Sequence, residues 1–350
     1  MIPLRRLLAL LLLCATLLLS ACAGTQTTEG YSLTLWYVEG DPLAPAITRL
    51  AEDYNRSRGR DTLPVTLRAW SSEEQLRATL QRSTVPALVL CPHTMALQLE
   101  EFGLLRESGI PSPSYPDWLT QRADCVGHGF YPIGFSLPLL CTREDAPSSL
   151  PALLSYAAGQ GQTSGLPALY VGRFAPLFYQ TLLDRGTEFT ADPVRDSSSE
   201  DYVNLYNALM ACRFAHGLAY GPAVDTACCL DDSAALAART LEGFRLTPLS
   251  GGPLLAEGRG LAVTARDTRM QRALPDFLRY LIEAGRLSRA ALEAGLIPAW
   301  EEELSPSGPL ETVLLQLRGR TLHLPDAESK YYVNQADFEQ SFLDALELLH

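Results

Sequence analysis

Lysine is almost absent from this sequence. Its 350 residues include 28 basic side chains, and all of them except Lys330 are arginines. A Walker-A phosphate loop or a Schiff-base enzyme needs a lysine, which here would have to be Lys330. The segment before it, Ala327–Ser329, contains no glycine that would form a phosphate loop. We therefore expect neither P-loop nucleotide chemistry nor pyridoxal chemistry.

Common catalytic and metal-binding motifs are also missing. The sequence contains no His-Glu-x-x-His, no Cys-x-x-Cys and no Gly-x-Ser-x-Gly, since Gly134–Pro138 lacks the final glycine of the last motif. Its five histidines are too scattered to give a metal-ligand spacing. We interpret adjacent acidic pairs such as Asp231-Asp232 as solvated surface. The sequence thus predicts no cofactor, no metal site and no enzymatic activity.

Positive charge is in deficit as well. There are 40 acidic side chains against 28 basic ones, so the formal net charge is −12, and no stretch clusters the arginines. Proteins that bind nucleic acids carry basic patches, so we expect no nucleic-acid partner. Apolar residues make up 47% of the chain, which is enough to bury the cores of two ordinary domains and to exclude wholesale disorder.

The longest apolar run lies at the N-terminus and has the pattern of an export signal. Arg5 and Arg6 precede Leu7–Leu19. As a helix this run spans roughly 20 Å, which is short of a ~30 Å hydrocarbon core. We therefore interpret it as a secretory signal rather than a membrane anchor.

The end of this run, Leu19-Ser-Ala-Cys22, resembles the lipobox of bacterial lipoproteins. The resemblance implies that Cys22 receives a lipid and becomes the first residue after cleavage. A plain signal peptide with an incidental cysteine is the alternative. We expect residues 1–21 to be the signal peptide and residues 22–30 a flexible tether. The rest of the chain would then be lipid-anchored at the extracytoplasmic face of the cell membrane.

The remaining cysteines leave several possibilities open. An even number in an exported protein permits up to three disulfides. Cys212 lies on the apolar stripe of an expected helix, where a buried thiol is an equal alternative. The vicinal pair Cys228-Cys229 could form a strained ring or bind a metal. The six cysteines concerned are Cys91, Cys125, Cys141, Cys212, Cys228 and Cys229.

Strands and helices alternate along the first part of the chain. Three apolar segments, Tyr31–Tyr37, Pro64–Trp70 and Pro86–Cys91, predict strands, and a helical pattern follows each. Short connections between them imply right-handed crossovers in a buried parallel sheet, which binds ligands at the carboxyl ends of its strands. The first expected helix has Asp41 as its N-cap. The other two cover Glu73–Gln81 and His93–Leu104.

A second set of elements follows the segment Phe130–Cys141, which is expected to be extended. Further extended segments are expected at Pro167–Val171, Phe244–Leu249 and Gly260–Thr264. The expected helices are Leu150–Ala158, Phe174–Leu183, Ser199–His216, Ser233–Phe244, Met270–Ala284, Ser288–Ala294 and a last helix capped by Asn334.

Three parts of the sequence carry a family resemblance. They are Leu33–Asp41 with Ile47–Asn55; Val85–Leu90; and Gly260–Ala265 with Ala273–Leu281 and Gly295–Pro298. In this order, behind a lipobox, they resemble the first strand and helix, the third strand and the return segment of the extracellular solute-binding proteins of ABC importers, the maltose-type sugar receptors.

This resemblance implies an α/β protein with the two-lobe, type II fold of periplasmic binding proteins. In that fold, hinge strands cross between the lobes, and the lobes close on a ligand. Lobe 1 would comprise residues 31–135 and 255–297, and lobe 2 residues 140–250 and 298–350. The protein would act as a monomer that presents its closed state to the permease subunits.

Candidate ligand-contacting residues follow from the chemistry of sugars, which present hydroxyl edges and apolar faces to aromatic and carboxylate side chains. Structural roles are the alternative for several of them: an N-cap for Asp41, a cap of the sheet for Trp70 and a helix cap for His93. Arg173 would suit an anionic group, or else be a surface charge. The candidates are Tyr37, Glu39, Asp41, Trp70, His93, Tyr170, Arg173, Phe174 and Trp300.

Together these patterns predict a binding protein that captures a small polar solute, above all a carbohydrate, and delivers it to an ABC importer. Two alternatives belong to other classes: a lipoprotein hydrolase of the cell envelope, and a degenerate binding-protein fold that acts as an interaction module. Ligand-induced thermal stabilisation would separate the binding protein from both.

Overall fold

The computed structural model describes most of the chain beyond the expected tether. The described residues are 32–60, 62–82, 85–108, 110, 129–143, 145–184, 200–221, 228–237, 243–249, 252–299, 310–317, 320–324 and 331–347. The expected signal peptide, Cys22, Cys125 and Trp300 lie outside them. Within these ranges no helix combines the length and the apolar character that a bilayer crossing requires.

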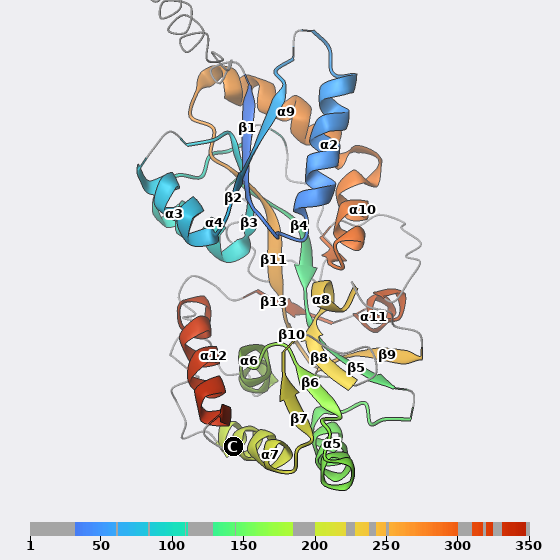
Figure 1. Ribbon diagram of the computed structural model, residues 1–350. Coiled ribbons are helices and arrows are strands. Elements are labelled where there is room, and N and C mark those ends of the chain that lie inside the picture. The colour runs from blue at the N-terminus through green and yellow to red at the C-terminus, as the bar shows by residue number, and fades with distance from the viewer. Residues whose placement is uncertain are drawn as a thin grey trace, which may run out of the picture.

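The first lobe, at the top of Figure 1, is built around a mixed sheet of six described strands. The first three strands are parallel, because each helical crossover returns the chain to the end of the sheet at which the previous strand began. Of the later strands, Glu257–Val263 runs antiparallel to the first three. Phe130–Ser136 pairs antiparallel with Glu257–Val263 and therefore runs in the same direction as the first three. In spatial order the strands are β12 (Ile297–Pro298), β4 (Phe130–Ser136), β11 (Glu257–Val263), β3 (Leu88–Pro92), β1 (Leu33–Val38) and β2 (Val65–Trp70).

Helices cover both faces of this sheet. Successive residues of a strand point to opposite faces, so Leu88 and Leu90 pack on one side and Val89 and Cys91 on the other. The first side is covered by α2 (Ala44–Ser57), α9 (Thr268–Ile282) and α10 (Arg286–Glu293), and the second by α3 (Glu73–Arg82) and α4 (His93–Glu101).

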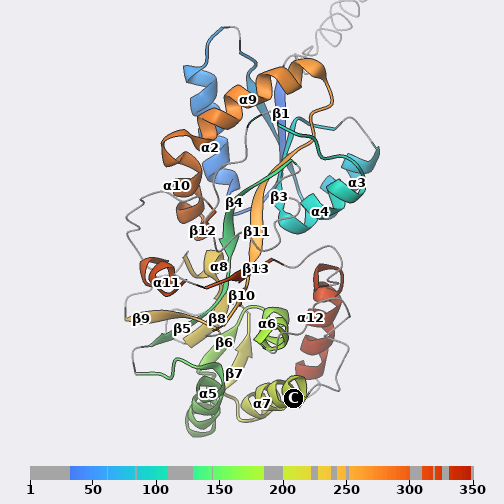
Figure 2. The ribbon, with the colours of Figure 1, turned by 180° about the vertical axis from the view of Figure 1, so that it is seen from behind.

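The second lobe holds another mixed sheet of five described strands. Its helices lie around the sheet in both views of the ribbon (Figures 1 and 2). The strands, in spatial order, are β7 (Leu218–Tyr220), β6 (Leu169–Val171), β8 (Cys228–Asp232), β5 (Pro138–Arg143) and β9 (Phe244–Pro248). The helices are α5 (Leu150–Ser164), α6 (Ala175–Asp184), α7 (Glu200–Phe214), α8 (Ser233–Ala237), α11 (Leu310–Leu317) and α12 (Tyr331–Glu347).

Two described segments cross between the lobes. After β4 the chain passes through Leu137 directly into β5 of the second sheet. The return runs from β10 (Leu254–Leu255), which pairs with β13 (Leu322–His323), through Ala256 into β11. β4 and β11 are neighbours along the whole crossing, and Glu257 pairs with Ser136. These two crossings form the hinge region.

The structure changes several expected elements. Phe130–Cys141 is two strands in different sheets rather than one extended segment. Phe244 begins β9, so the helix expected to reach it from Ser233 is wrong at this end. The N-cap of α2 is Leu43 instead of Asp41, whose carboxylate accepts the Leu43 N–H (2.9 Å) in the turn before the helix.

No disulfide joins the described cysteines, and the expectation of up to three disulfides is not met among them. Cys91, Cys141, Cys212, Cys228 and Cys229 are all buried thiols. Cys212 is the clearest case, because burial raises the pKa of its thiol to about 11. Cys212 therefore behaves as a small hydrophobic side chain in the core of lobe 2.

Candidate functional site

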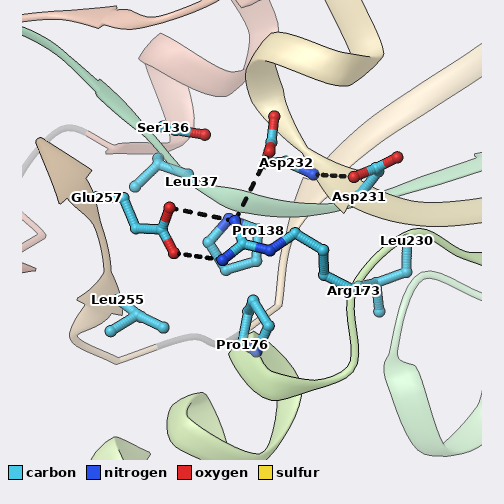
Figure 3. Close-up of a pocket in the computed structure, with 10 residues that line it drawn as sticks. All are labelled: Ser136, Leu137, Pro138, Arg173, Pro176, Leu230, Asp231, Asp232, Leu255 and Glu257. Carbon is cyan, nitrogen blue, oxygen red and sulfur yellow. Dashed lines mark hydrogen bonds and ion pairs between the residues drawn. The ribbon is translucent and has the colours of Figure 1, made fainter. Parts of the chain in front are cut away.

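A small pocket lies at the hinge region and takes its walls from both crossings and from lobe 2. Parallel strands β6 and β8 end side by side, which places the residues after them beside the crossings. The pocket has about 10 Å³ of space for the centre of a water molecule, room for one such molecule. The residues that line it are Ser136, Leu137, Pro138, Arg173, Pro176, Leu230, Asp231, Asp232, Leu255 and Glu257 (Figure 3). We call it the hinge pocket.

Arg173 is held by acidic partners in this pocket. Both of its terminal nitrogens donate to the Glu257 carboxylate, at 3.1 and 2.9 Å, in a bidentate pair. Asp232 lies 3.9 Å from the same guanidinium group. The sequence predicted Arg173 just after a strand, either as a partner of an anionic group of the solute or as a surface charge. In the structure its fork binds Glu257, which is the first residue of the hinge strand β11.

Two adjacent carboxylates form another wall of the hinge pocket. Asp231 Oδ1 accepts the N–H of Asp232 at 2.9 Å, and Asp232 Oδ1 accepts the N–H of Ala235 at 2.8 Å, in the first turn of α8. Gly172 makes room for them, because a Cβ there would lie 2.4 Å from an oxygen of Asp231. Asp231 and Asp232 are half-buried pocket residues, so their interpretation as solvated surface is wrong.

Ser136 contributes a buried hydroxyl group to the pocket. Its side chain is at the end of β4, and the residue is 6% exposed. Among the residues that the structure describes, none forms a hydrogen bond with Ser136 Oγ. A buried polar atom of this kind calls for an explanation, since most such atoms in folded proteins are hydrogen-bonded.

On the lobe 1 side, Asp41 is fixed by the hinge strand. Its Oδ2 atom accepts a hydrogen bond from Arg259 Nη1 at 2.8 Å, and the residue is buried. Arg259 follows Glu257 by two positions, so the two side chains leave the same face of β11. One strand face therefore holds Asp41 of lobe 1 through Arg259 and Arg173 of lobe 2 through Glu257.

The other candidates of lobe 1 gather at the carboxyl ends of β1 and β2. Trp70 packs on Trp36 with ring centroids 5.1 Å apart, and the Arg68 guanidinium lies 4.3 Å from the centre of the Trp70 ring. Tyr37 is half-buried against the core that α2 covers. Glu39 is exposed just beyond the strand. None of these three candidates, Trp70, Tyr37 and Glu39, lines the hinge pocket.

Two candidates are buried and face the interior. His93 is 2% exposed at the start of α4, with its ring 6.1 Å from that of Phe130. Phe174 has no exposed surface, and its ring lies 4.7 Å from that of Phe342 in the core of lobe 2. In this arrangement neither ring offers a surface to a solute, which corrects the expectation for Phe174 and His93.

Tyr170 lines a different pocket, at the other end of the lobe 2 sheet. This pocket measures about 350 Å³. It includes Pro167 and Cys228, which lie at the beginnings of β6 and β8, whereas the hinge pocket lies beyond the ends of these strands. Tyr170 and Arg173 are therefore not part of one site, although they are close in sequence. Trp300 lies outside the described residues.

The comparisons with known proteins concern the fold. No protein-family model and no curated protein matches the chain. Among solved structures, the GacH receptor of Streptomyces glaucescens shares 13% identity at a TM-score of 0.68, covering 91% of this chain and 94% of its own. The cyclic alpha-maltosyl-1,6-maltose binding protein of Arthrobacter globiformis shares 15% at 0.63, covering 91% and 97%. UgpB of Mycobacterium tuberculosis shares 16% at 0.63, covering 91% and 98%. The chain thus has the two-lobe fold of the solute-binding proteins of ABC importers, and the expected fold class is confirmed.

Proposed function

We propose that this chain, which has the fold of ABC-importer solute-binding proteins, captures a small polar solute between its lobes and delivers it to a permease. The observation that carries the proposal is the pocket at the crossings, where Arg173 on lobe 2 is joined to Glu257 on the strand that enters lobe 1. A solute that contacts both sides of a hinge stabilises the closed state relative to the open one. Binding alone accounts for this arrangement, and the proposal includes no chemical step.

The proposed solute is a carbohydrate or polyol. Structures with this fold were solved with acarbose, with mannobiose and with ribitol, all of which are rich in hydroxyl groups. One was solved with glycerophosphocholine, which is also small and polar. Carboxylate and hydroxyl side chains such as those of Asp232 and Ser136 are suitable partners for such molecules.

Binding can be tested by thermal unfolding of the mature, lipidated protein in detergent. Acarbose, mannobiose, ribitol and glycerophosphocholine would each be added up to 10 mM. A solute at 100 times its dissociation constant adds about 2.7 kcal/mol to the free energy of unfolding. For a chain of about 330 residues, whose unfolding entropy at the midpoint is about 0.7 kcal/mol/K, this raises the melting temperature by roughly 4 °C. If none of these compounds, nor a wider panel of sugars and polyols, shifts the transition, the proposal is contradicted.

Delivery needs an uptake measurement in cells. Accumulation of the stabilising solute, supplied in radiolabelled form, is expected to fall when the gene for this protein is deleted and to recover when it is restored. Uptake that is unchanged by the deletion would contradict a role in delivery while leaving binding intact.

We also propose that Cys22 anchors the protein to the membrane surface. Labelled palmitate is expected to enter the wild-type protein, which should sediment with membranes, and neither should occur with Cys22→Ser. Cys14→Ser is the matched control, because Cys14 lies within the expected signal peptide and is removed with it. Labelling of the Cys22→Ser protein would contradict the anchor.

A further inference from the structure

We infer that the hinge pocket selects its solute by charge: it binds a primary ammonium group in preference to a hydroxyl group and disfavours carboxylates and phosphates. This inference rests on the proposed function, because it names the class of solute that the interlobe site takes. It identifies Asp232 and Ser136 as the residues that receive the ammonium group.

The charges that line the pocket disfavour an anion. Three carboxylates, those of Asp231, Asp232 and Glu257, line the pocket together with one guanidinium group. Glu257 occupies both terminal nitrogens of Arg173, so that the cation is already neutralised by one partner. A carboxylate or phosphate that enters must therefore displace Glu257 and approach the two aspartates. An ammonium group meets the carboxylates of Asp231 and Asp232 instead.

The pocket also holds hydrogen-bond acceptors for an ammonium group. Asp232 Oδ1 caps α8, but Asp232 Oδ2 lies 3.9 Å from Arg173, which is beyond hydrogen-bond distance. Ser136 Oγ is buried and has no hydrogen-bond partner among the described residues. In Figure 3 this hydroxyl oxygen points toward the Asp232 carboxylate. The two oxygens can together accept two N–H bonds from one ammonium group.

The size of the pocket and its apolar walls also disfavour an anion. The pocket has room for one water molecule, and an ammonium or hydroxyl group is about as large as water. Carboxylate and phosphate groups have several heavy atoms and do not fit. The other walls are the apolar side chains of Leu137, Pro138, Pro176, Leu230 and Leu255. They supply no donor for an anion, and they lower the local dielectric, which strengthens the effect of the carboxylates.

Among the described residues, no group of histidine, cysteine and acidic side chains could hold a metal ion, and this includes the three carboxylates of the pocket. A divalent cation is therefore a poor candidate for the positive charge. An organic ammonium group needs only two or three hydrogen bonds, in no fixed coordination geometry.

The test uses two trios of probes that differ at one group. The first trio is glucose, 6-amino-6-deoxyglucose and glucuronate, which differ at C6. The second is glucitol, 1-amino-1-deoxyglucitol and gluconate, which differ at C1. Dissociation constants would be measured by titration calorimetry on the mature protein. We expect the amine of a trio to bind at least tenfold more tightly than the hydroxyl compound, which corresponds to about 1.4 kcal/mol, and the acid at least tenfold more weakly.

Variants then assign this preference to the pocket. Asp232→Asn keeps an oxygen for the Ala235 N–H and should reduce the ratio of amine to hydroxyl affinity to threefold or less. Ser136→Ala should weaken binding of both compounds. Asp276→Asn, an exposed change on α9, is the matched control and should leave the ratio unaltered. In the wild type, raising the salt concentration from 0.05 to 0.5 M should weaken binding of the amine more than binding of the hydroxyl compound. This measurement does not depend on whether any variant folds.

The outcomes separate the two proposals. If no member of either trio binds, and the wider panel of sugars and polyols also fails, the proposed function falls and this inference falls with it. If hydroxyl compounds bind but the amines bind no more tightly, or the acids bind as well, the charge selection is refuted while the solute-binding function stands. A ratio that Asp232→Asn does not change would equally refute the assignment to the hinge pocket.

Discussion

Glu339 joins the C-terminal helix to the helix that follows the hinge pocket, and its removal gives the sharpest stability prediction. Its carboxylate accepts the N–H of Phe174 at 2.7 and 3.0 Å through its two oxygens, and the N–H of Ala175 at 2.8 Å. These groups belong to the N-terminus of α6, where backbone N–H groups lack partners within the helix and a negative charge is favoured. α12 therefore caps α6 through a single side chain.

The magnitude follows from the donors that Glu339→Ala leaves behind. Each buried N–H without an acceptor costs about 1–3 kcal/mol, and two N–H groups lose theirs. The interaction of the charge with the helix N-terminus adds about 0.3–1 kcal/mol. We expect a loss of about 2–7 kcal/mol for Glu339→Ala. Glu339→Gln keeps one acceptor oxygen, and we expect it to lose about 1 kcal/mol.

The pH dependence of this effect has a definite sign. Burial raises the pKa of Glu339 above its ordinary value of 4.5, although the N–H groups of Phe174 and Ala175 and the charge of Arg173 act to lower it. For a carboxyl group whose pKa is raised by folding, the associated stability is fully present below pH 4.5 and is lost as the pH rises through the folded-state value. The difference between wild type and Glu339→Gln should therefore be largest in acid and smaller at neutral pH.

Urea unfolding with two signals would measure this prediction. Far-UV circular dichroism reports both lobes, whereas the fluorescence of Trp36 and Trp70 reports lobe 1 once Trp118 and Trp300 are replaced by phenylalanine in every protein compared. Glu339→Ala should shift the circular dichroism transition more than the fluorescence transition, because α6 and α12 are packed in lobe 2. Glu347→Ala, an exposed change on the same helix, is the control. If Glu339→Ala unfolds within 0.5 kcal/mol of wild type, a threshold set by the usual scatter of about 0.5 kcal/mol for surface changes, the capping argument is refuted.

Two further predictions concern single residues. Gly172→Ala places a Cβ 2.4 Å from Asp231 Oδ2. We therefore expect about 1–3 kcal/mol of destabilisation, measured by urea unfolding, and weaker solute binding, measured by calorimetry. Unchanged binding would show that the Asp231 carboxylate can move without an effect on the solute. Because burial raises the pKa of Cys212 to about 11, iodoacetamide at pH 8 should label it only after unfolding, as followed by mass spectrometry; rapid labelling of the native protein would contradict its burial.

The sequence identified β1, β2, β3 and the three-residue strand β6, and missed β7 and the five-residue strand β8. β1, β2 and β3 were predicted because each carries a run of apolar residues long enough to show in the pattern, and each precedes a helix. β7 has three residues, Leu218–Tyr220, and pairs with β6 alone. A segment this short has no periodicity of its own, and its strand conformation depends on a neighbour that lies far away in the sequence.

Only part of the candidate site was predicted, because the site also depends on residues that lie far apart in the sequence. The rule that ligands bind at strand ends located Arg173 correctly at the end of β6. Its partner Glu257 is 84 positions away and comes beside it only because β11 crosses between the lobes. The Asp231-Asp232 pair was misjudged because adjacent carboxylates were assessed as if on a helix. Here they end a strand, and Asp232 caps the short helix α8.

Three consecutive residues of β11 show how the hinge strand is held. Glu257 and Arg259 project from one face and bind Arg173 of lobe 2 and Asp41 of lobe 1. Gly258 faces the other way, and a Cβ there would lie 3.2 Å from the Cβ of His93, so His93 packs closely behind the hinge. Alternate residues of a strand face opposite sides of the sheet. If the pairing of β11 shifted by one residue, Glu257 and Arg259 would turn away from their ion-pair partners and toward His93, where only a glycine fits closely. The segment Glu257-Gly-Arg259 therefore fixes both the register of the hinge strand and its attachment to each lobe, and it gives His93 a packing role at the back of the hinge.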